Sequence, residues 1–240
     1  MTRVFACSTD FTLSFCDTAI LLESICEKRL ARSKQLIRPE DRLRSVLAGA
    51  LARYAVSLTL RAELATIRLE KDEHGKPFVP DSPDLHLSLS HAGSWIACSV
   101  SDAPTGIDVE YKRGAHMDVA SSFFALGERA WLAEAASPDE RTERFYAIWT
   151  AKESYTKAVG LGLGLGLRSF ETSTSSTPAA IVERDGTSTG FVIHRVEIDP
   201  EHACALCTRE DERDIWIECS TDRDLVAFYR SNARTRSREH

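Results

Sequence analysis

The segment Gly106-Ile107-Asp108-Val109-Glu110 constrains the fold most strongly, because its apolar and acidic side chains alternate at the spacing of a β-strand. Residues two apart on a strand share a face, so Asp108 and Glu110 project together while Val109 points the other way, into the core. Two carboxylates on one face offer paired oxygens to a hard cation. A solvated acidic strand edge is the alternative interpretation of this pair.

A second segment, Trp149-Thr150-Ala151-Lys152-Glu153-Ser154-Tyr155-Thr156-Lys157, adds a third carboxylate and two lysines. Positions four apart on a helix stack, so Glu153 and Lys157 share a face in the favoured order, with the acid first. Taken alone, such a pair is also explained as a surface ion pair. Strand and helix carboxylates beside lysines suit Mg²⁺ on a phosphate-bearing substrate, because Mg²⁺ takes a few protein oxygens and completes its shell with water and phosphate.

The composition limits the class of protein. The chain has 240 residues, of which 43% are hydrophobic and 28% are charged, as is ordinary for a globular protein with one large domain or two small ones. Its apolar stretches are shorter than a membrane span, and its N-terminus lacks signal-peptide anatomy. Seven scattered cysteines favour a reducing compartment over a disulfide framework. We therefore expect a cytoplasmic protein that does not contact a membrane.

The charge distribution argues against a general nucleic-acid binder, because the net charge is −6. Positive charge is local instead, and it gathers in an early segment: Lys28, Arg29, Arg32, Lys34, Arg38, Arg42 and Arg44. Arg44 and Ser45 lie near the beginning of a predicted helix, where an anion could meet side chains and backbone donors.

A Cys-x-x-Cys pair, Cys204 and Cys207, follows His202 and raises the possibility of a zinc site. No second pair lies at the spacing that a structural zinc site normally shows. The alternation of Ala203, Ala205 and Cys207 is better explained by a buried strand.

Apolar periodicity predicts the order of elements. The first half should contain a strand near 4–7, a helix around 20–30, an amphipathic helix introduced by Pro39, and strands at 67–70, 85–90 and 95–101. After the turn cluster 101–106, the order repeats, with a strand at 107–111, helical segments around 118–136, a long helix over 138–159 that ends at Gly160, and further strands. This order predicts two similar α/β halves.

We accordingly assign residues 1–103 to an N-terminal half, 104–230 to a C-terminal half, and 231–240, which lack an apolar period, to a flexible tail. Residues 160–167 repeat Gly and Leu. They follow a helix rather than a strand, so a loop is favoured over a dinucleotide-binding turn.

Two further motifs carry polar side chains on turns. Gly75-Lys76-Pro77 places a lysine on a rigid turn, and Ser90 and His91 end the strand at 85–90. Adjacent Ser and His residues do not ordinarily point at each other, and the chain has no Gly-x-Ser-x-Gly elbow, so a Ser-His-Asp hydrolase is disfavoured.

Read in order, Gly75-Lys76-Pro77, Leu89-Ser90-His91, Gly106-Ile107-Asp108-Val109-Glu110 and Phe145-x-x-x-Trp149-x-x-Lys152-Glu153-x-x-x-Lys157 resemble the surfactin-type 4′-phosphopantetheinyl transferases. The resemblance spans roughly residues 29 to 167. It implies an α/β (α+β) fold of two similar halves about a pseudo-two-fold axis, with coenzyme A in the cleft between them. It also implies transfer of the phosphopantetheine arm from coenzyme A to a serine of an acyl- or peptidyl-carrier protein, with release of 3′,5′-ADP.

The resemblance also implies residue roles. Asp108, Glu110 and Glu153 would hold Mg²⁺ against the pyrophosphate of coenzyme A, with Glu153 and Lys157 as catalytic residues. The nucleotide and its phosphates would contact a further set: Arg29, Arg32, Arg44, Ser45, Lys76, Pro77, Ser90 and His91, together with Asp108, Glu153 and Lys157. Glu128 matches an acidic position next to the site. The extended Gly-Leu repeat departs from the shorter glycine-rich stretch of the family.

Two other functions stay open on the sequence alone. One is a module that binds coenzyme A or a carrier without transfer, although a cluster of like charges is costly to keep without a use. The other is a metal-dependent phosphohydrolase, which would leave the Lys76 and Ser90-His91 motifs unexplained. The sequence does not identify the carrier or its pathway; Leu126, Trp131 and Leu132 are candidates for the contact. An internally duplicated fold can complete its cleft within one chain, so we expect a monomer.

Overall fold

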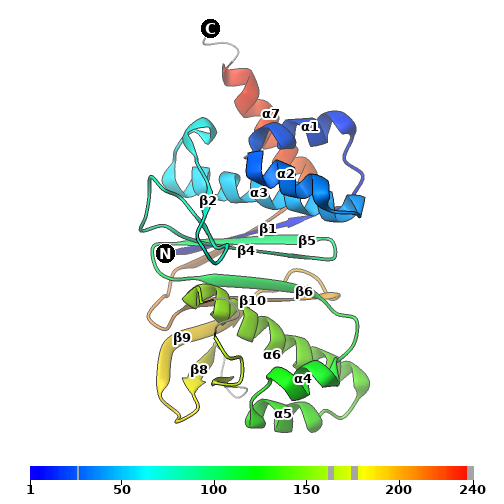
Figure 1. Ribbon diagram of the computed structural model, residues 1–240, viewed down its shortest axis with the longest axis vertical. Coiled ribbons are helices and arrows are strands. Elements are labelled where there is room, and N and C mark those ends of the chain that lie inside the picture. Colours follow the sequence, from blue (N-terminus) through cyan, green and yellow to red (C-terminus); the bar gives the residue numbers. More distant parts are fainter. Residues whose placement is uncertain (26, 162–164, 174–177, 237–240) are drawn as a thin grey trace.

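The computed structural model describes residues 1–25, 27–161, 165–173 and 178–236, and these form four layers. Figure 1 shows two β-sheets in the middle of the molecule, with one group of helices above them and another below. The predicted α/β fold of two similar halves is confirmed. Part of the Gly-Leu repeat, residues 162–164, lies outside the described residues, and the prediction for its loop is untested there.

The first sheet has the strand order β11-β1-β5-β4-β3-β2. Its strands are β1 (Thr2–Ser8), β2 (Glu70–Lys71), β3 (Pro77–Phe78), β4 (His86–Ala92), β5 (Trp95–Ser101) and β11 (Ile215–Thr221). The helices of this half are α1 (Phe15–Ser24), α2 (Glu27–Gln35), α3 (Pro39–Leu60) and α7 (Asp222–Arg236), and a short 3₁₀ helix, η1, covers Leu64–Thr66. Strand β11 runs parallel to β1, whereas β1 and β5 are antiparallel.

The second sheet has the order β6-β10-β9-β8-β7. Its strands are β6 (Gly106–Tyr111), β7 (Phe170–Thr172), β8 (Ala179–Glu183), β9 (Ser188–Arg195) and β10 (His202–Arg209). The helices of this half are α4 (Met117–Phe123), α5 (Leu126–Ala133) and α6 (Pro138–Val159).

Strict alternation along the central strands sorts their side chains between two cores. On β1, Phe5 and Cys7 belong to the core under α3, whereas Val4 and Ala6 belong to the core between the two sheets. On β6, Ile107 and Val109 join the same inter-sheet core. Because successive side chains on a strand point to opposite faces, the other face of β6 carries Asp108 and Glu110 toward α6.

The two long helices, α3 and α6, have matching ends. Each has 22 residues, carries a proline in its first turn and ends at a residue with positive φ, namely Arg61 (φ 52°) and Gly160 (φ 80°). Gly160 thus provides the predicted helix stop, since glycine adopts this conformation without steric cost. Within the described residues, α3 alone combines the length and apolar composition that crossing a membrane would require, and 61% of its apolar window is buried inside the fold.

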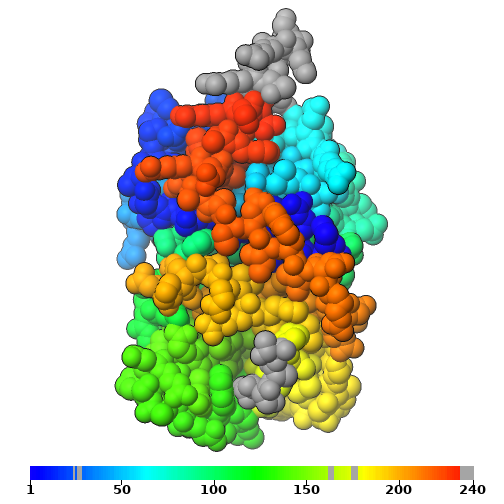
Figure 2. Space-filling view, turned by 180° about the vertical axis from the view of Figure 1, so that it is seen from behind, coloured from blue at the N-terminus to red at the C-terminus, as the bar shows by residue number. Residues whose placement is uncertain are grey.

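The C-terminal segment departs from the predicted division into halves. Strand β11 pairs with the free edge of β1, with Val4 opposite Ile217, so residues 215–236 lie with the first sheet rather than with the second. Figure 2 shows this segment, orange to red, on the same part of the molecule as the N-terminal residues in blue. Without β11, the backbone N–H and C=O groups along one edge of β1 would have no partners. A buried strand needs hydrogen-bond partners on both sides, which explains why the C-terminal segment pairs with the first sheet.

Two other local predictions are corrected. Helix α7 continues to Arg236, so the predicted tail starts too early. Ser231 Oγ and Asn232 Nδ2 both donate to the carbonyl of Phe228, one turn earlier in the helix. Residues 237–240 lie outside the described part of the chain. The strand expected at 67–70 is reduced to β2, because Leu64–Thr66 forms a 3₁₀ turn just before it.

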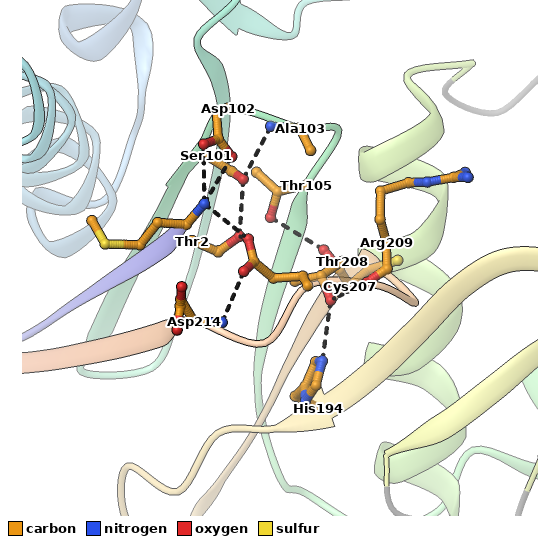
Figure 3. Close-up of polar contacts among 12 residues, drawn as sticks. Thr2, Ser101, Asp102, Ala103, Thr105, His194, Cys207, Thr208, Arg209 and Asp214 are labelled. Atoms are coloured by element: carbon orange, nitrogen blue, oxygen red, sulfur yellow. Dashed lines mark hydrogen bonds and ion pairs between the residues drawn. The ribbon is translucent and has the colours of Figure 1, made fainter.

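Polar side chains join the connections between the sheets (Figure 3). Thr2 Oγ1 lies 2.9 Å from Ser101 Oγ, and Ser101 Oγ accepts from the backbone N–H of Ala103 at 3.2 Å. Thr105 Oγ1 donates to the carbonyl of Cys207 at 3.1 Å. The 102–105 connection is therefore bonded to both halves, and it leads directly into β6.

Candidate active site

Asp108 is the centre of the predicted site, and it is nearly buried at 3% exposure. Its Oδ1 accepts from Lys157 Nζ at 2.7 Å and from Ser90 Oγ at 2.9 Å. Lys157 Nζ also donates to the carbonyl of Ile107 at 3.1 Å. The structure therefore brings together residues from β4, β6 and α6 that the sequence analysis had selected separately.

The second carboxylate oxygen of Asp108, Oδ2, is buried and accepts no hydrogen bond from the described residues. A buried carboxylate oxygen normally has a partner, because an unpaired one loses its hydration without compensation. Asp108 therefore has one oxygen committed to Lys157 and Ser90 and one oxygen available to a cation.

The other two predicted acids lie within electrostatic reach of Asp108. Burial and then the charge of Asp108 raise the pKa of Glu110 to about 6, although Trp149 Nε1 donates to its Oε1 at 3.2 Å. Burial and then Asp108 also raise the pKa of Glu153, against the opposing effect of Lys157. Like charges gathered at a half-buried position disfavour ionisation, so this cluster is one that a cation would stabilise.

The three acids are not preassembled as a ligand set. Among the described residues, no three His, Cys, Asp or Glu side chains are gathered closely enough to hold a metal ion. Mutual repulsion and the Lys157 ion pair explain the open arrangement, since Lys157 already compensates Asp108. The oxygen-only donor set and the unpaired Oδ2 nevertheless fit a hard cation such as Mg²⁺, and the ligand assignment stays a prediction.

The Cys-x-x-Cys pair does not form a zinc site. Cys204 lies in the core between the sheets and Cys207 lies in the core under α6, because residues three apart on a strand point to opposite faces. His202 Nδ1 instead contacts Asp199 at 2.9 Å. The interpretation of this segment as a buried strand, β10, is confirmed.

Lys76 and Pro77 reach the site from the first sheet. Lys76 Nζ donates to the carbonyls of Lys157 and Ala158 at 2.7 and 3.1 Å, so it caps the C-terminal turn of α6. A cation is favourable there because the helix macrodipole is negative at that end. Burial lowers the pKa of Lys76. The sequence did not reveal this helix contact, since the two segments are far apart in the chain.

A cavity of about 530 Å³ opens beside these groups. Four of the predicted site residues line it, namely Lys76, Pro77, Glu153 and Lys157. The other walls come mostly from β4, the end of α4, the last turns of α6 and the segment that follows α6, and they include Ser88, Leu89, Phe123, Thr156, Leu165 and Leu167. The cavity therefore presents Glu153 and Lys157 to whatever enters it.

Three basic residues, Arg44, Lys157 and Arg29, lie within electrostatic range of His91. Burial lowers the pKa of His91, and the charges of Arg44, Lys157 and Arg29 lower it further. Arg29 Nη1 donates to the carbonyl of Ser45 at 3.0 Å. Three cations thus lie near His91, and such a local concentration of positive charge attracts anions.

Arg44 and Ser45 were expected near the beginning of a helix, and the structure places them farther along it. Helix α3 begins at Pro39, so Arg44 and Ser45 lie beyond its first four residues and their backbone N–H groups are not among the free donors of the helix end. Ser45 is buried, and Arg32 is exposed on α2. Arg44 remains a side-chain cation of the cluster, and it forms an ion pair with Asp41.

Lys152 and Glu128 form a fully buried ion pair next to the site. The sequence analysis assigned no role to Lys152. Lys152 Nζ lies 2.9 Å from Glu128 Oε2, and both side chains have zero exposure. Lys152 also donates to the carbonyls of Leu167 and Phe170, while Glu128 accepts from the backbone N–H groups of Ala125 and Thr172. The pair therefore fixes α5, α6 and the segment at 167–172, part of which lines the cavity. No local pattern in the sequence indicates this pair, because Glu128 and Lys152 lie on different helices.

Comparisons with known proteins agree with this geometry. A profile of the 4′-phosphopantetheinyl transferase superfamily matches residues 104–207, and a profile of the 4′-phosphopantetheinyl transferase N-terminal region matches residues 13–102. A 4′-phosphopantetheinyl transferase of Bacillus subtilis is 29% identical over 93% of this chain and 100% of its own length. The transferase Sfp of Bacillus subtilis strain 168 is 30% identical over 85% of this chain and 91% of its own.

Among solved structures, a holo-(acyl-carrier-protein) synthase from Bacillus anthracis, in complex with CoA (3′,5′-ADP), aligns with 46% of this chain and 97% of its own, with a TM-score of 0.37 and 23% identity. The relatives that match in sequence extend over both halves of the fold. On the strength of these sequence matches, the chain belongs to the 4′-phosphopantetheinyl transferase superfamily.

Proposed function

We propose that this chain transfers the 4′-phosphopantetheine group from coenzyme A to a serine of an acyl- or peptidyl-carrier protein, with Mg²⁺ held by Asp108, Glu110 and Glu153. Membership of the transferase superfamily supports the reaction. The observation that supports the cation is the buried, unpartnered Oδ2 of Asp108 next to two acids whose pKa values are raised.

In the transfer, the serine oxygen bonds to the β-phosphorus of coenzyme A, the bond from that phosphorus to the bridging oxygen breaks, and 3′,5′-ADP leaves. A bound Mg²⁺ would supply charge neutralisation on the pyrophosphate. Lys157 faces the cavity and would neutralise charge on the leaving group. Glu153 lines the cavity and would accept the proton of the serine hydroxyl.

The nucleotide would lie against the basic residues around His91. Arg29, Arg44 and Lys157 already depress the pKa of His91, and the phosphates of coenzyme A would reverse that effect. Ser90, which precedes His91, donates to Asp108, and Lys76 caps the end of α6 next to Lys157. Residues of both halves thus serve one site, which is consistent with a monomer.

The carrier would approach from the α4–α5 side of the cavity. Phe123 lines the cavity and is 43% exposed, and Leu126 is 77% exposed on α5. Leu132, which the sequence analysis also considered, is fully buried in the core and is withdrawn from this surface. Trp131 is half-buried beneath the guanidinium of Arg144.

The test is the Glu153→Gln variant, with Glu143→Gln as its control. Both residues lie on α6, but Glu143 is half-exposed and pairs with Lys112, away from the cavity. Glu153→Gln should bind coenzyme A and lose a factor on the order of 10² to 10⁴ in kcat, the range typical of a lost general base. Unchanged kcat at saturating Mg²⁺ would remove Glu153 from this role.

A mass measurement separates the three functions considered. An apo-carrier incubated with coenzyme A, Mg²⁺ and this protein should gain the phosphopantetheine mass on its serine. A pure binding module would leave the carrier unchanged, and a phosphohydrolase would release phosphate from nucleotides without any carrier. A panel of purified apo-carriers in the same assay would identify which class the protein serves.

A further inference from the structure

His202 is a buried histidine outside the site described above, and one of its nitrogens is unexplained. Its side chain is 1% exposed, and its Nε2 is buried without a hydrogen-bond partner among the described residues. Its Nδ1 lies 2.9 and 3.0 Å from the two carboxylate oxygens of Asp199. A carboxylate accepts hydrogen bonds, so this contact orients the ring with Nε2 on the far side from Asp199.

Asp199 is itself held firmly. Trp95 Nε1 donates to its Oδ2 at 2.5 Å, and the backbone N–H groups of Glu201 and His202 donate to its Oδ1. Burial raises the pKa of Asp199, but the hydrogen bonds from His202 and Trp95 outweigh it, so the pKa lies below its ordinary value. The His202 ring also meets Tyr111 edge-on, with ring centroids 5.0 Å apart. The ring therefore has a fixed orientation.

The free edge of the ring faces the turn between β4 and β5. A Cβ atom added to Gly93 would lie 2.3 Å from His202 Nε2, and Gly93 has a φ of 53°. The ring thus fills the space that a side chain at this position would need. His202 belongs to the second sheet and Gly93 lies in the turn that joins β4 and β5 of the first, so this contact joins the two halves.

The same turn accepts a hydrogen bond from one residue of the nucleotide set and directly follows the strand that carries another. The carbonyl of Gly93 accepts from Arg44 Nη1 at 2.7 Å, and His91 lies two residues earlier, near the end of β4. The turn is also bonded to the chain after β1, since the backbone N–H of Thr9 donates to the carbonyl of Ser94. Any shift of Gly93 would therefore move the acceptor that orients Arg44.

We propose that His202, oriented by Asp199, is a positioning residue for nucleotide binding: its ring is the surface against which the Gly93 turn rests, and through that turn it sets Arg44 and His91. This inference rests on the proposed function, because it assumes that Arg44 and His91 contact the nucleotide of coenzyme A. It assigns His202 no contact with the substrate. The aromatic ring, rather than its basicity, is the active feature.

The experiment measures the Kd of 3′,5′-ADP by calorimetry, together with KM for coenzyme A and kcat, on the full chain. His202→Ala should weaken 3′,5′-ADP binding and raise KM about tenfold, the scale of a lost supporting contact behind a ligand-binding group, while kcat at saturating coenzyme A changes little. His202→Phe keeps a ring against Gly93 and should recover most of the affinity. His194→Ala is the matched control, because His194 is a half-buried histidine on β9 bonded to Thr208.

A double-mutant cycle with Gly93→Ala tests the contact itself. Gly93→Ala should weaken binding through the clash with the ring, and adding His202→Ala should remove that part of the loss, so the two effects should not add. Additive effects, or a His202→Ala protein that binds 3′,5′-ADP as the parent does, would overturn the proposal. If the parent chain itself fails to bind 3′,5′-ADP, the proposed function fails instead, and the two failures are distinguished.

Discussion

Lys157 Nζ lies 2.7 Å from Asp108 Oδ1, and this contact joins the last turn of α6 to the middle of β6. The lysine is partly exposed and the aspartate is almost buried. Lys157 therefore compensates a charge that would otherwise be costly to bury, and it leaves Oδ2 of the same carboxylate without a partner among the described residues.

Asp108→Asn should preserve the fold and lower kcat/KM by at least 10²-fold, the scale of a lost electrostatic contact to the reacting charge. The Mg²⁺ concentration for half-maximal activity should rise, because one anionic ligand is removed. The measurement is a Mg²⁺ titration of carrier modification. Asp118→Asn, at an exposed position on α4, is the control and should match the parent protein. An unaltered Mg²⁺ profile in Asp108→Asn would contradict the ligand assignment.

The acidic cluster predicts a pH dependence through Glu110, whose pKa is raised from 4.5 to about 6. A raised carboxyl pKa means that the fold favours the neutral form, so this group's contribution to stability is full below pH 4.5 and is lost as the pH rises to about 6. The difference in Tm between the parent and Glu110→Gln, measured in EDTA, should change across this window and level off on either side.

Activity should have the opposite dependence on pH, because a cation binds the ionised carboxylate. At limiting Mg²⁺, kcat/KM should fall as the pH decreases through about 6, and Mg²⁺ binding near that pH should release protons. Calorimetry in buffers of different ionisation enthalpy measures the released protons. Equal proton release by the parent and by Glu110→Gln would exclude Glu110 as the titrating group.

The buried pair of Lys152 and Glu128 predicts a large effect on stability. Lys152→Met leaves Glu128 charged and fully buried, and removal of one partner of such a pair costs about 3–5 kcal/mol. Urea unfolding should show this loss in the free energy of unfolding. Arg195→Ala is the control, since its ion pair with Glu197 is mostly exposed and should change stability by less than about 1 kcal/mol. A loss in Lys152→Met no larger than in the control would refute the prediction.

The proposed carrier surface on α4 and α5 predicts a variant in which the KM for the carrier changes and the KM for coenzyme A does not. Leu126→Asp replaces a side chain that is 77% exposed, so the fold should be unaffected. KM for the apo-carrier should rise several-fold, whereas KM for coenzyme A should not change, because Leu126 does not line the cavity. Initial rates at varied carrier and varied coenzyme A separate the two constants. Ile37→Asp, at an exposed position between α2 and α3, is the matched control.

Local patterns in the sequence predicted much of the fold. The alternation of Asp108, Val109 and Glu110 correctly placed both carboxylates on one face of β6. Pro138 and Gly160 correctly bounded α6, because a proline suits a first turn and a glycine suits a left-handed end. These features depend on contacts between near neighbours, which the sequence displays directly.

Local patterns did not predict the contacts between residues that are distant in the chain. The return of β11 to β1, the cap that Lys76 places on α6 and the burial of Lys152 against Glu128 each depend on how remote elements pack. Burial also set the raised pKa of Glu110, since desolvation is its largest cause.

The sequence by itself therefore determined the elements, the two halves and the acidic and basic groups of the site. Only the tertiary structure decided which charges meet: Lys157 on one oxygen of Asp108, and His202 against Gly93 across the two sheets. The physical reason is that periodicity along a chain fixes the face on which a side chain lies, whereas its partner and its exposure to water depend on the packing of the whole fold.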